Sequence, residues 1–150
     1  MICKGYDLVE NINSKEAYDL LREDKKSVLI DVRTKKEHLA VGVPDLREIG
    51  KETCLIEWKN SILPWSRKSF LNDFNKNLAL DQEGKYIFIC RSGIRSNFAA
   101  LTVEESFISG NYNSKCFNIA DGFEGHEGHE QPSGDSQNQT GWKNLGLPWK

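Results

Sequence analysis

The feature that most constrains the fold is a short apolar strand that runs directly into a helix. Residues 86–90 read Tyr-Ile-Phe-Ile-Cys, an apolar run of the length expected for a strand buried on both faces. A tight turn over residues 91–93 follows, and helical spacing of apolar side chains then continues as far as Gly110, the expected C-cap. That spacing is carried by Phe98, Ala99, Val103 and Phe107. Such a unit is typical of a parallel sheet covered by helices.

Other segments of the chain alternate between strand and helix in the same manner. Short apolar runs predict further strands over residues 28–32, 54–58 and 115–119. Asn13 and Glu16 have the spacing of a capping box, which predicts that a helix begins there. A second amphipathic helix is expected over residues 66–78. We therefore expect an α/β fold in which a central parallel sheet is flanked by helices.

Length and charge limit both the domain organisation and the classes of partner. A chain of 150 residues is long enough for one ordinary core, so we expect a single domain over residues 1–150. Its formal net charge of −2 predicts no binding of nucleic acid and no association with an acidic membrane. The N-terminus lacks the apolar stretch of a signal peptide, and the four cysteines are widely spaced. We therefore expect a cytoplasmic protein with reduced thiols.

The chain becomes polar between residues 124 and 140 and apolar again at its end. The segment 124–140 is rich in Gly, Ser, Gln and Asn, so we expect an exposed and mobile loop within the domain. It opens with two histidines and three glutamates in residues 124–130, but no other ligand lies nearby in sequence and we expect no metal site. Residues 141–149 are expected to form a helical turn, capped by Gly146, that packs its tryptophans on the domain.

The chemistry is expected where the strand 86–90 meets its helix. Cys90 stands at the carboxyl end of that strand, which is where open parallel sheets bind ligands. The helix N-terminus offers unsatisfied N–H groups and a partial positive charge, so it favours a thiolate and can hold an anion. Two arginines in the same segment add positive charge for an anionic substrate. We therefore predict Cys90 as the catalytic nucleophile, with a substrate-binding set of Arg91, Ser92, Gly93, Ile94, Arg95 and Ser96.

This segment resembles the active-site loop of rhodanese-homology domains, in which a cysteine opens a six-residue loop. Residues 29–33 (Leu-Ile-Asp-Val-Arg), 119–123 (Ile-Ala-Asp-Gly-Phe) and 141–149 (a Gly-Trp start and a Gly-Leu-Pro-Trp end) are similar to other motifs of that family. The resemblance implies a sulfurtransferase of the thiosulfate sulfurtransferase type, which takes sulfane sulfur from a donor such as thiosulfate as a persulfide on Cys90. The implied acceptor is cyanide, a thiol or a thioredoxin-like protein. No cofactor motif appears, and we expect no cofactor.

The first of these motifs raises two further expectations. An acidic residue beside an arginine at a strand end is usually an ion pair that fixes loops, so we assign Asp31 and Arg33 a structural role behind the site. The family's common His-x-x-Gly-Ala segment is missing after this motif, and residues 37–45 stand in its place with a Gly-Val-Pro that resembles a bacterial subgroup of single-domain rhodaneses. Within that segment His38 is expected to be an exposed loop residue, with assistance in proton transfer as the alternative.

Two other functions remain open. A cysteine phosphatase or arsenate reductase also places a thiolate at a helix start, but its loop has five residues between cysteine and arginine. Four residues separate Cys90 from Arg95, and Ile89 stands where phosphatases usually have histidine. The second alternative is a regulatory rhodanese-like module that only binds a partner. Such modules typically lack the loop cysteine, which this chain has.

Overall fold

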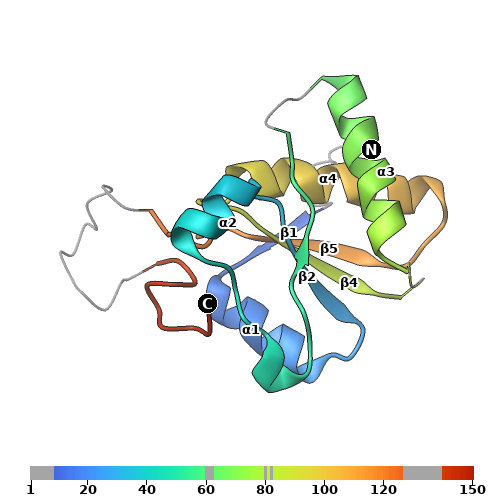
Figure 1. The fold of residues 1–150 in the computed structure, drawn as a ribbon. Helices are drawn as coiled ribbons and strands as arrows, with labels where there is room; N and C mark the ends of the chain where they lie inside the picture. Colours follow the sequence, from blue (N-terminus) through green and yellow to red (C-terminus); the bar gives the residue numbers. More distant parts are fainter. Residues whose placement is uncertain (1–8, 60–62, 80, 82, 127–139) are drawn as a thin grey trace.

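The computed structural model describes residues 9–59, 63–79, 81, 83–126 and 140–150. Within these residues, five strands form one sheet: β1 (Val9–Ile12), β2 (Ser27–Asp31), β3 (Cys54–Leu55), β4 (Lys85–Ile89) and β5 (Lys115–Ile119). Their spatial order is β1-β5-β4-β2-β3, and every neighbouring pair is parallel. The predicted α/β fold with a central parallel sheet is confirmed (Figure 1).

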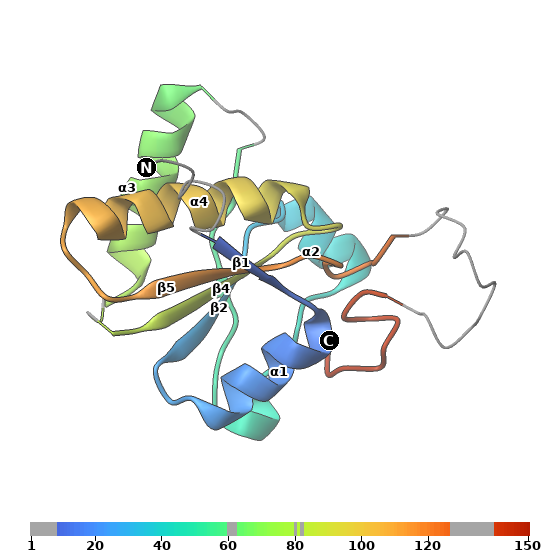
Figure 2. The ribbon, with the colours of Figure 1, turned by 180° about the vertical axis from the view of Figure 1, so that it is seen from behind.

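Helices cover both faces of this sheet. They are α1 (Ser14–Glu23), α2 (Lys35–Val41), α3 (Pro64–Asn77) and α4 (Ile94–Ser109), with a short 3₁₀ turn over Arg47–Ile49. The two ribbon views show α1 on one face and both α3 and α4 on the other (Figures 1 and 2). None of the helices in the described part of the chain is long and apolar enough to cross a membrane.

The central strand β4 shows why both faces must be covered. Ile87 and Ile89 pack into the core cluster that contains the apolar side chains of α1. Tyr86 and Phe88 point the other way, into the cluster formed with α3 and α4. Successive side chains of a strand alternate between faces, so an unbroken apolar run requires apolar partners on both sides. The run that dominates the sequence therefore forms the middle of a three-layer structure.

Most of the predicted elements are present, but the structure also contains one strand and one α-helix that the sequence analysis did not predict. The capping box of Asn13 and Glu16 starts α1 as expected, and Gly110 is the C-cap residue of α4. Of the predicted strand 54–58, two residues form β3 and the rest is extended chain at the sheet edge. The edge strand β1 and helix α2 were not predicted. A capping box of Thr34 and Glu37 starts α2, so its sequence did contain a helix signal.

The C-terminal segment packs on the domain largely as predicted. Trp142 is completely buried, and residues 142–146 form the expected turn, with a helix-like hydrogen bond of 3.0 Å from Leu145 N to the carbonyl of Gly141. Gly146, the expected cap, has a positive φ of 76°. Trp149 is 44% exposed, yet its ring lies edge-on to Phe123 with 6.5 Å between the ring centroids, so it also packs on the domain as expected. Trp65 on α3, in contrast, is 64% exposed. Most of the predicted loop 124–140 lies outside the described residues. Of the described part, Glu124 N donates to the carbonyl of Arg91 and Gly125 is buried, so the segment is not exposed from its first residue.

Asp121 joins three segments that are distant in sequence. It follows β5, and its Oδ1 accepts hydrogen bonds from the backbone N and the Oγ of Ser14 at the start of α1, at 2.9 and 3.0 Å. Its Oδ2 accepts a third bond of 2.7 Å from the backbone N of Gly141. These donors are buried, so without the carboxylate they would lose hydrogen bonds that water cannot replace.

We predict that Asp121→Ala lowers the free energy of unfolding by about 2–4 kcal/mol, because buried hydrogen bonds to a charged acceptor are lost. Urea unfolding followed by circular dichroism measures the change. Asp19→Ala is the matched control, since Asp19 is only half-buried on the surface of α1 and, among the described residues, its ion pair is with Arg22. It should cost less than about 0.5 kcal/mol. Equal effects of the two substitutions would contradict the role assigned to Asp121.

Candidate active site at the carboxyl ends of the strands

Cys90 directly follows β4 and is held at the N-terminus of α4. Its side chain is 1% exposed, and its Sγ accepts hydrogen bonds from the backbone N of Gly93 at 3.2 Å and of Ser96 at 3.3 Å. Gly93 is the N-cap residue of α4, and no side chain caps the helix in the usual way. The sulfur therefore takes the place of the side-chain oxygen that normally satisfies these N–H groups. Such donors favour negative charge on the sulfur.

A buried polar network lies behind the sulfur. The Oγ of Ser96 is 3.1 Å from Cys90 Sγ and donates a hydrogen bond of 2.6 Å to the Oδ1 of Asn118 on β5. The Nδ2 of Asn118 donates to the carbonyl of Gly93 at 3.1 Å and to the Oδ1 of Asn11 on β1 at 3.0 Å. Sequence reasoning did not single out Asn118. The available signal was an asparagine that stands between the apolar residues Phe117 and Ile119 of a predicted strand.

Two glycines allow the loop after β4 and the segment after β5 to pack backbone against backbone. Gly93 has a φ of 97°, and a Cβ there would collide with the carbonyl oxygen of Ala120. Gly122 has a φ of 67°, and a Cβ there would collide with the carbonyl of Arg91. Two hydrogen bonds join the same segments, from Phe123 N to the carbonyl of Cys90 at 2.8 Å and from Glu124 N to that of Arg91 at 3.0 Å. The segment 119–123 thus fixes the shape of the loop.

The two arginines of the loop both face carboxylates. Arg95 on α4 binds Glu37 on α2 through two hydrogen bonds of 2.7 and 2.8 Å, so this pair connects the two helices. The Arg95 guanidinium, with help from the backbone N–H of the α2 capping box, lowers the pKa of Glu37 to about 2. Glu37 in turn raises the pKa of Arg95. Arg91 is 62% exposed along its side chain, and its Nε lies 3.3 Å from Glu124.

Asp31 and Arg33 form a completely buried ion pair beside the loop. Arg33 Nη2 donates to Asp31 Oδ2 at 2.7 Å and to the carbonyl of Gly42 at 2.8 Å. The expectation that His38 is an exposed loop residue was wrong. His38 lies on α2, and its Nε2 is 3.3 Å from Asp31 Oδ1. Burial by itself would raise the pKa of Asp31, but His38 and Arg33 together lower it. This cluster holds the end of β2 against α2 and the segment around Gly42.

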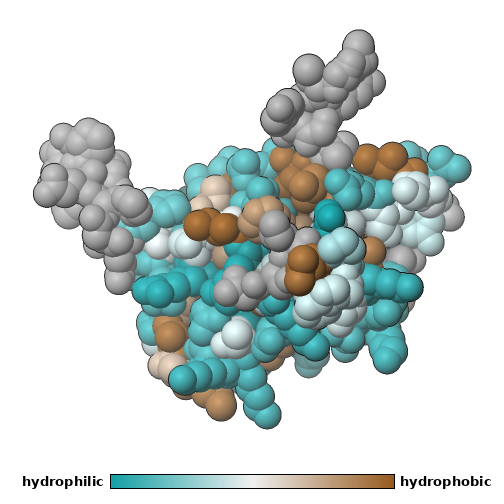
Figure 3. Space-filling view, turned by 90° about the horizontal axis from the view of Figure 1, so that it is seen from above, coloured by the Kyte–Doolittle hydropathy of each residue, from teal (hydrophilic) through white to brown (hydrophobic). Residues whose placement is uncertain are grey.

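The predicted substrate-binding residues separate into two groups. Gly93 and Ser96 are buried and contact the sulfur of Cys90, whereas Arg91 and Ile94 are exposed and Ser92 and Arg95 are half-buried. Ile94 is 67% exposed. The face that carries α2, α3 and α4 shows several separate apolar patches among hydrophilic side chains (Figure 3). The loop therefore presents backbone donors inward and the side chains of Arg91 and Ile94 outward.

The other described cysteines do not share this environment. Burial raises the pKa of the Cys54 thiol on β3, and it raises that of Cys116 on β5 well above its usual value. Cys3 lies outside the described residues. Among those that are described, no group of histidine, cysteine and carboxylate side chains could hold a metal ion. Most of the His/Glu segment 124–130 is not described, so the expectation for it stays a prediction.

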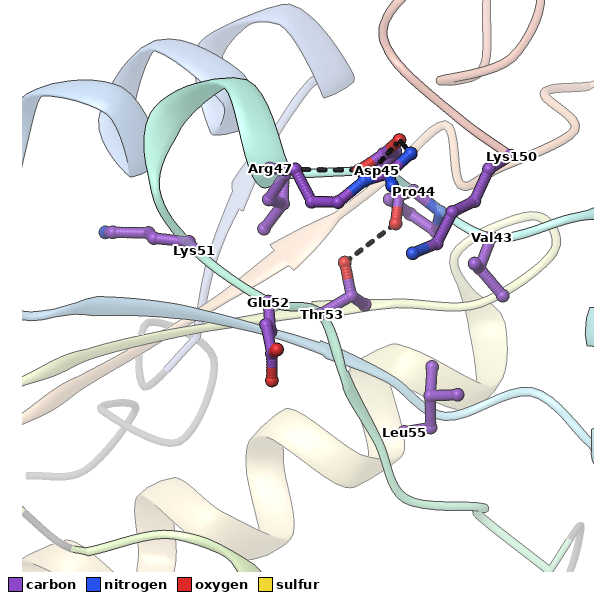
Figure 4. A pocket seen from close by; sticks show the side chains of 10 residues that line it. Val43, Pro44, Asp45, Arg47, Lys51, Glu52, Thr53, Leu55 and Lys150 are labelled. Atoms are coloured by element: carbon purple, nitrogen blue, oxygen red, sulfur yellow. Dashed lines mark hydrogen bonds and ion pairs between the residues drawn. The ribbon is translucent and has the colours of Figure 1, made fainter.

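A pocket of about 190 Å³ lies away from the loop 90–96 (Figure 4). It is lined by residues 43–47, 51–53, 55 and 150. Arg47 pairs with Asp45 inside this group, and the Oγ1 of Thr53 donates to the carbonyl of Pro44. Lys51 donates to the carbonyls of Asp24 and Ser27. These side chains hold one another in place and do not contribute to the environment of Cys90.

The ion pair between Glu37 and Arg95 predicts a pH-dependent stability. Its carboxyl has a pKa of about 2 in the folded protein, below the usual 4.5, so the stabilisation is complete above about pH 4.5 and is lost as the pH falls towards 2. We expect Glu37→Gln to lower the free energy of unfolding by about 1–2 kcal/mol at pH 6, with allowance for solvent screening, and by progressively less below pH 4.5.

Urea unfolding at several pH values measures this difference. Glu10→Gln is the matched control, because Glu10 pairs with Lys115 at an exposed position. Its effect should be small at every pH. A Glu37→Gln effect that stays constant from pH 6 to about pH 2 would contradict the assigned ion pair.

Comparison with known proteins agrees with this geometry. The model of the rhodanese-like domain matches residues 13–129. An uncharacterised protein of Rickettsia conorii is 34% identical over 142 residues, which is 95% of this chain and 98% of that protein. The crystal structure of Rv0390 from M. tuberculosis is 31% identical and covers 95% of this chain and 97% of its own, with a TM-score of 0.68.

A second solved structure shares the fold at lower identity. The polysulfide-sulfur transferase homodimer of Wolinella succinogenes is 23% identical, with a TM-score of 0.63, over 97% of this chain and 81% of its own. The family model covers most of the chain, and it includes β2, the loop after β4 and the segment after β5. The chain therefore belongs to the family of rhodanese-like domains.

Proposed function

We propose that this protein is a sulfurtransferase that carries sulfane sulfur as a persulfide on Cys90. The Cys90 thiolate attacks the outer sulfur of a donor such as thiosulfate, a new S–S bond forms, and the S–S bond of thiosulfate breaks as sulfite leaves with its electron pair. A thiophilic acceptor, either cyanide or a thiol, then attacks the outer sulfur of the persulfide. With cyanide as the acceptor, a C–S bond forms, the S–S bond of the persulfide breaks, and thiocyanate is released as the Cys90 thiolate is regenerated.

The observation that carries this proposal is the position of the Cys90 sulfur at the N-terminus of α4. Two backbone N–H groups point at Sγ, so negative charge on sulfur is stabilised at this point without any cofactor. The other described cysteines, half-buried Cys54 on β3 and buried Cys116 on β5, have pKa values raised by burial, which makes them poor nucleophiles. The membership in the rhodanese-like family supports the same chemistry.

The loop arginines have different roles in this proposal. Arg91 is exposed and forms the longer of the two ion pairs, so it is the cation that an anionic donor meets first. Arg95 is fixed by two short bonds to Glu37, and it acts mainly by holding α2 against the start of α4. The residues 91–96 together form the donor site, with the backbone N–H groups rather than the charges closest to the sulfur. A thioredoxin-like protein is one acceptor that could present its thiol to this exposed loop.

We predict that Cys90→Ser abolishes the formation of thiocyanate from thiosulfate and cyanide, because the serine oxygen cannot carry sulfane sulfur. Cys54→Ser is the matched control and should retain the activity, since Cys54 lies on the edge strand β3 and not in the loop. The assay should include polysulfide as a second donor, since the Wolinella protein of the same fold is named a polysulfide-sulfur transferase. Full activity of the Cys90→Ser variant would overturn the proposal.

The length of the loop predicts the outcome for the competing phosphatase function. A cradle built from converging N–H groups widens with each added residue, and four residues between Cys90 and Arg95 suit a single outer sulfur. Donors must lie within about 2.7–3.1 Å of developing charge to be effective, so a phosphoryl group should be poorly stabilised. We expect negligible hydrolysis of p-nitrophenyl phosphate. Substantial hydrolysis that disappears in Cys90→Ser would favour the phosphatase.

A further inference from the structure

Ser96 lies next to the sulfur of Cys90, and its hydroxyl has one proton to donate. Two acceptors are within reach of that proton: the sulfur at 3.1 Å and the Oδ1 of Asn118 at 2.6 Å. Which acceptor receives the proton decides whether Ser96 stabilises a negative charge on the sulfur or opposes it. The hydrogen bonds around Asn118 answer this question.

The orientation of the Asn118 carboxamide is fixed by its neighbours. Its Nδ2 faces the carbonyl oxygen of Gly93, at 3.1 Å, and a backbone carbonyl can only accept a hydrogen bond. The nitrogen must therefore point towards Gly93, and the oxygen points towards Ser96. A carboxamide oxygen is also only an acceptor, so in the 2.6 Å contact the Ser96 hydroxyl is the donor.

This arrangement leaves Ser96 with only oxygen lone pairs directed at Cys90. A neutral thiol fits this geometry, because the S–H group can donate to Ser96 Oγ. A thiolate does not fit as well. The hydroxyl would have to leave a short buried bond in order to donate to the sulfur, and Asn118 Oδ1 has no other hydrogen-bond donor among the described residues. Asn118 thus opposes the effect of the two backbone N–H groups that favour the thiolate.

We infer that Asn118 is a positioning residue of the Cys90 site, which holds the Ser96 hydroxyl as a hydrogen-bond acceptor facing the sulfur. Through Ser96 it makes the Cys90 thiolate less stable and more basic than the helix N-terminus alone would make it. A more basic thiolate is also the stronger nucleophile. The inference concerns the same site as the proposed function, but its test needs no sulfur donor. The two can therefore fail independently.

The decisive variant is Ser96→Ala. It shifts the pH midpoint of Cys90 thiolate formation in one direction if Ser96 donates to the sulfur, and in the other if Ser96 accepts from it. If Ser96 donated to the thiolate, its removal would shift the midpoint of thiolate formation to higher pH. If Asn118 holds Ser96 as an acceptor, removal of the hydroxyl destabilises the thiol and relieves the thiolate. The midpoint then shifts to lower pH, by about 0.4–1 unit for one hydrogen bond.

The substitutions of Asn118 test whether it acts through Ser96. Asn118→Leu removes the acceptor, frees the hydroxyl to donate to the sulfur and should lower the midpoint by a similar amount. Asn118→Asp keeps an acceptor for the hydroxyl and adds a negative charge, so it should raise the midpoint. Asn118→Leu should have little further effect when combined with Ser96→Ala. Asn11→Ala is the control, since Asn11 contacts Nδ2 of Asn118 and not the oxygen that holds Ser96.

The midpoint is measured from the ultraviolet absorbance of the thiolate, as a pH titration of each protein against the same protein with Cys90→Ser. The charged and titratable side chains near the loop are the same in the natural protein and in Ser96→Ala; they are Asp31, Arg33, Glu37, His38, Arg91, Arg95 and Glu124. Circular dichroism confirms that each variant is folded.

A higher or unchanged midpoint for Ser96→Ala overturns the inference, and so does a shift in the same direction for the leucine and aspartate variants of Asn118. If the Asn118 variants do not fold, the sign of the Ser96→Ala shift decides alone. The expected midpoint shifts, found in a natural protein that takes up no sulfur from thiosulfate or polysulfide, would count against the proposed function only.

Discussion

The arrangement of the site depends on hydrogen bonds between the N-terminus of α4 and the sulfur of Cys90. A helix that begins directly after a buried strand leaves its first N–H groups without partners, and here the sulfur accepts from two of them. The sulfur is therefore both a structural acceptor and the group available for chemistry. This dual role places strict demands on the surrounding backbone, because the loop must curl tightly enough for Gly93 and Ser96 to face the same atom.

Neighbouring segments meet those demands from three sides. Behind the loop, the residues after β5 pack against it through Gly122 and join it by two backbone hydrogen bonds. Beside it, the Glu37–Arg95 pair connects α2 to the first turn of α4. Beneath it, Asn118 holds both the carbonyl of Gly93 and the hydroxyl of Ser96. The parallel sheet brings these residues together because the strands β2, β4 and β5 all end at the same edge.

The sequence predicted the parts of this structure that arise from local patterns. The apolar run 86–90 determined β4 and both covered faces, and the turn and helix after it placed Cys90 correctly at a helix start. The contacts that complete the site were not predictable in the same way, because they join residues far apart in the chain. Glu37 and Arg95 are 58 positions apart, and Ser96 and Asn118 are 22 apart. Only the fold shows that the loop arginine is already paired with a carboxylate.

Other errors have local explanations. The strand β1 has four residues of mixed polarity at the sheet edge, so it lacks the apolar run that identified β4. Helix α2 has no buried residue, so its apolar periodicity is weak, although its capping box was present. His38 was expected to be exposed because a lone histidine in a loop usually is, but it lies on α2 and contacts Asp31, seven positions earlier at the end of a strand. A single sequence does not show that the two meet.

The central claim is that sulfane sulfur is carried on Cys90, and mass spectrometry tests it most directly. The intact protein is treated with thiosulfate, its mass is measured, and the modified site is then located by peptide mapping. The account predicts the addition of the mass of one sulfur atom, located on the peptide that contains Cys90 and removed by cyanide or dithiothreitol. A sulfur adduct located on another cysteine, or no adduct with thiosulfate or with polysulfide, would contradict it.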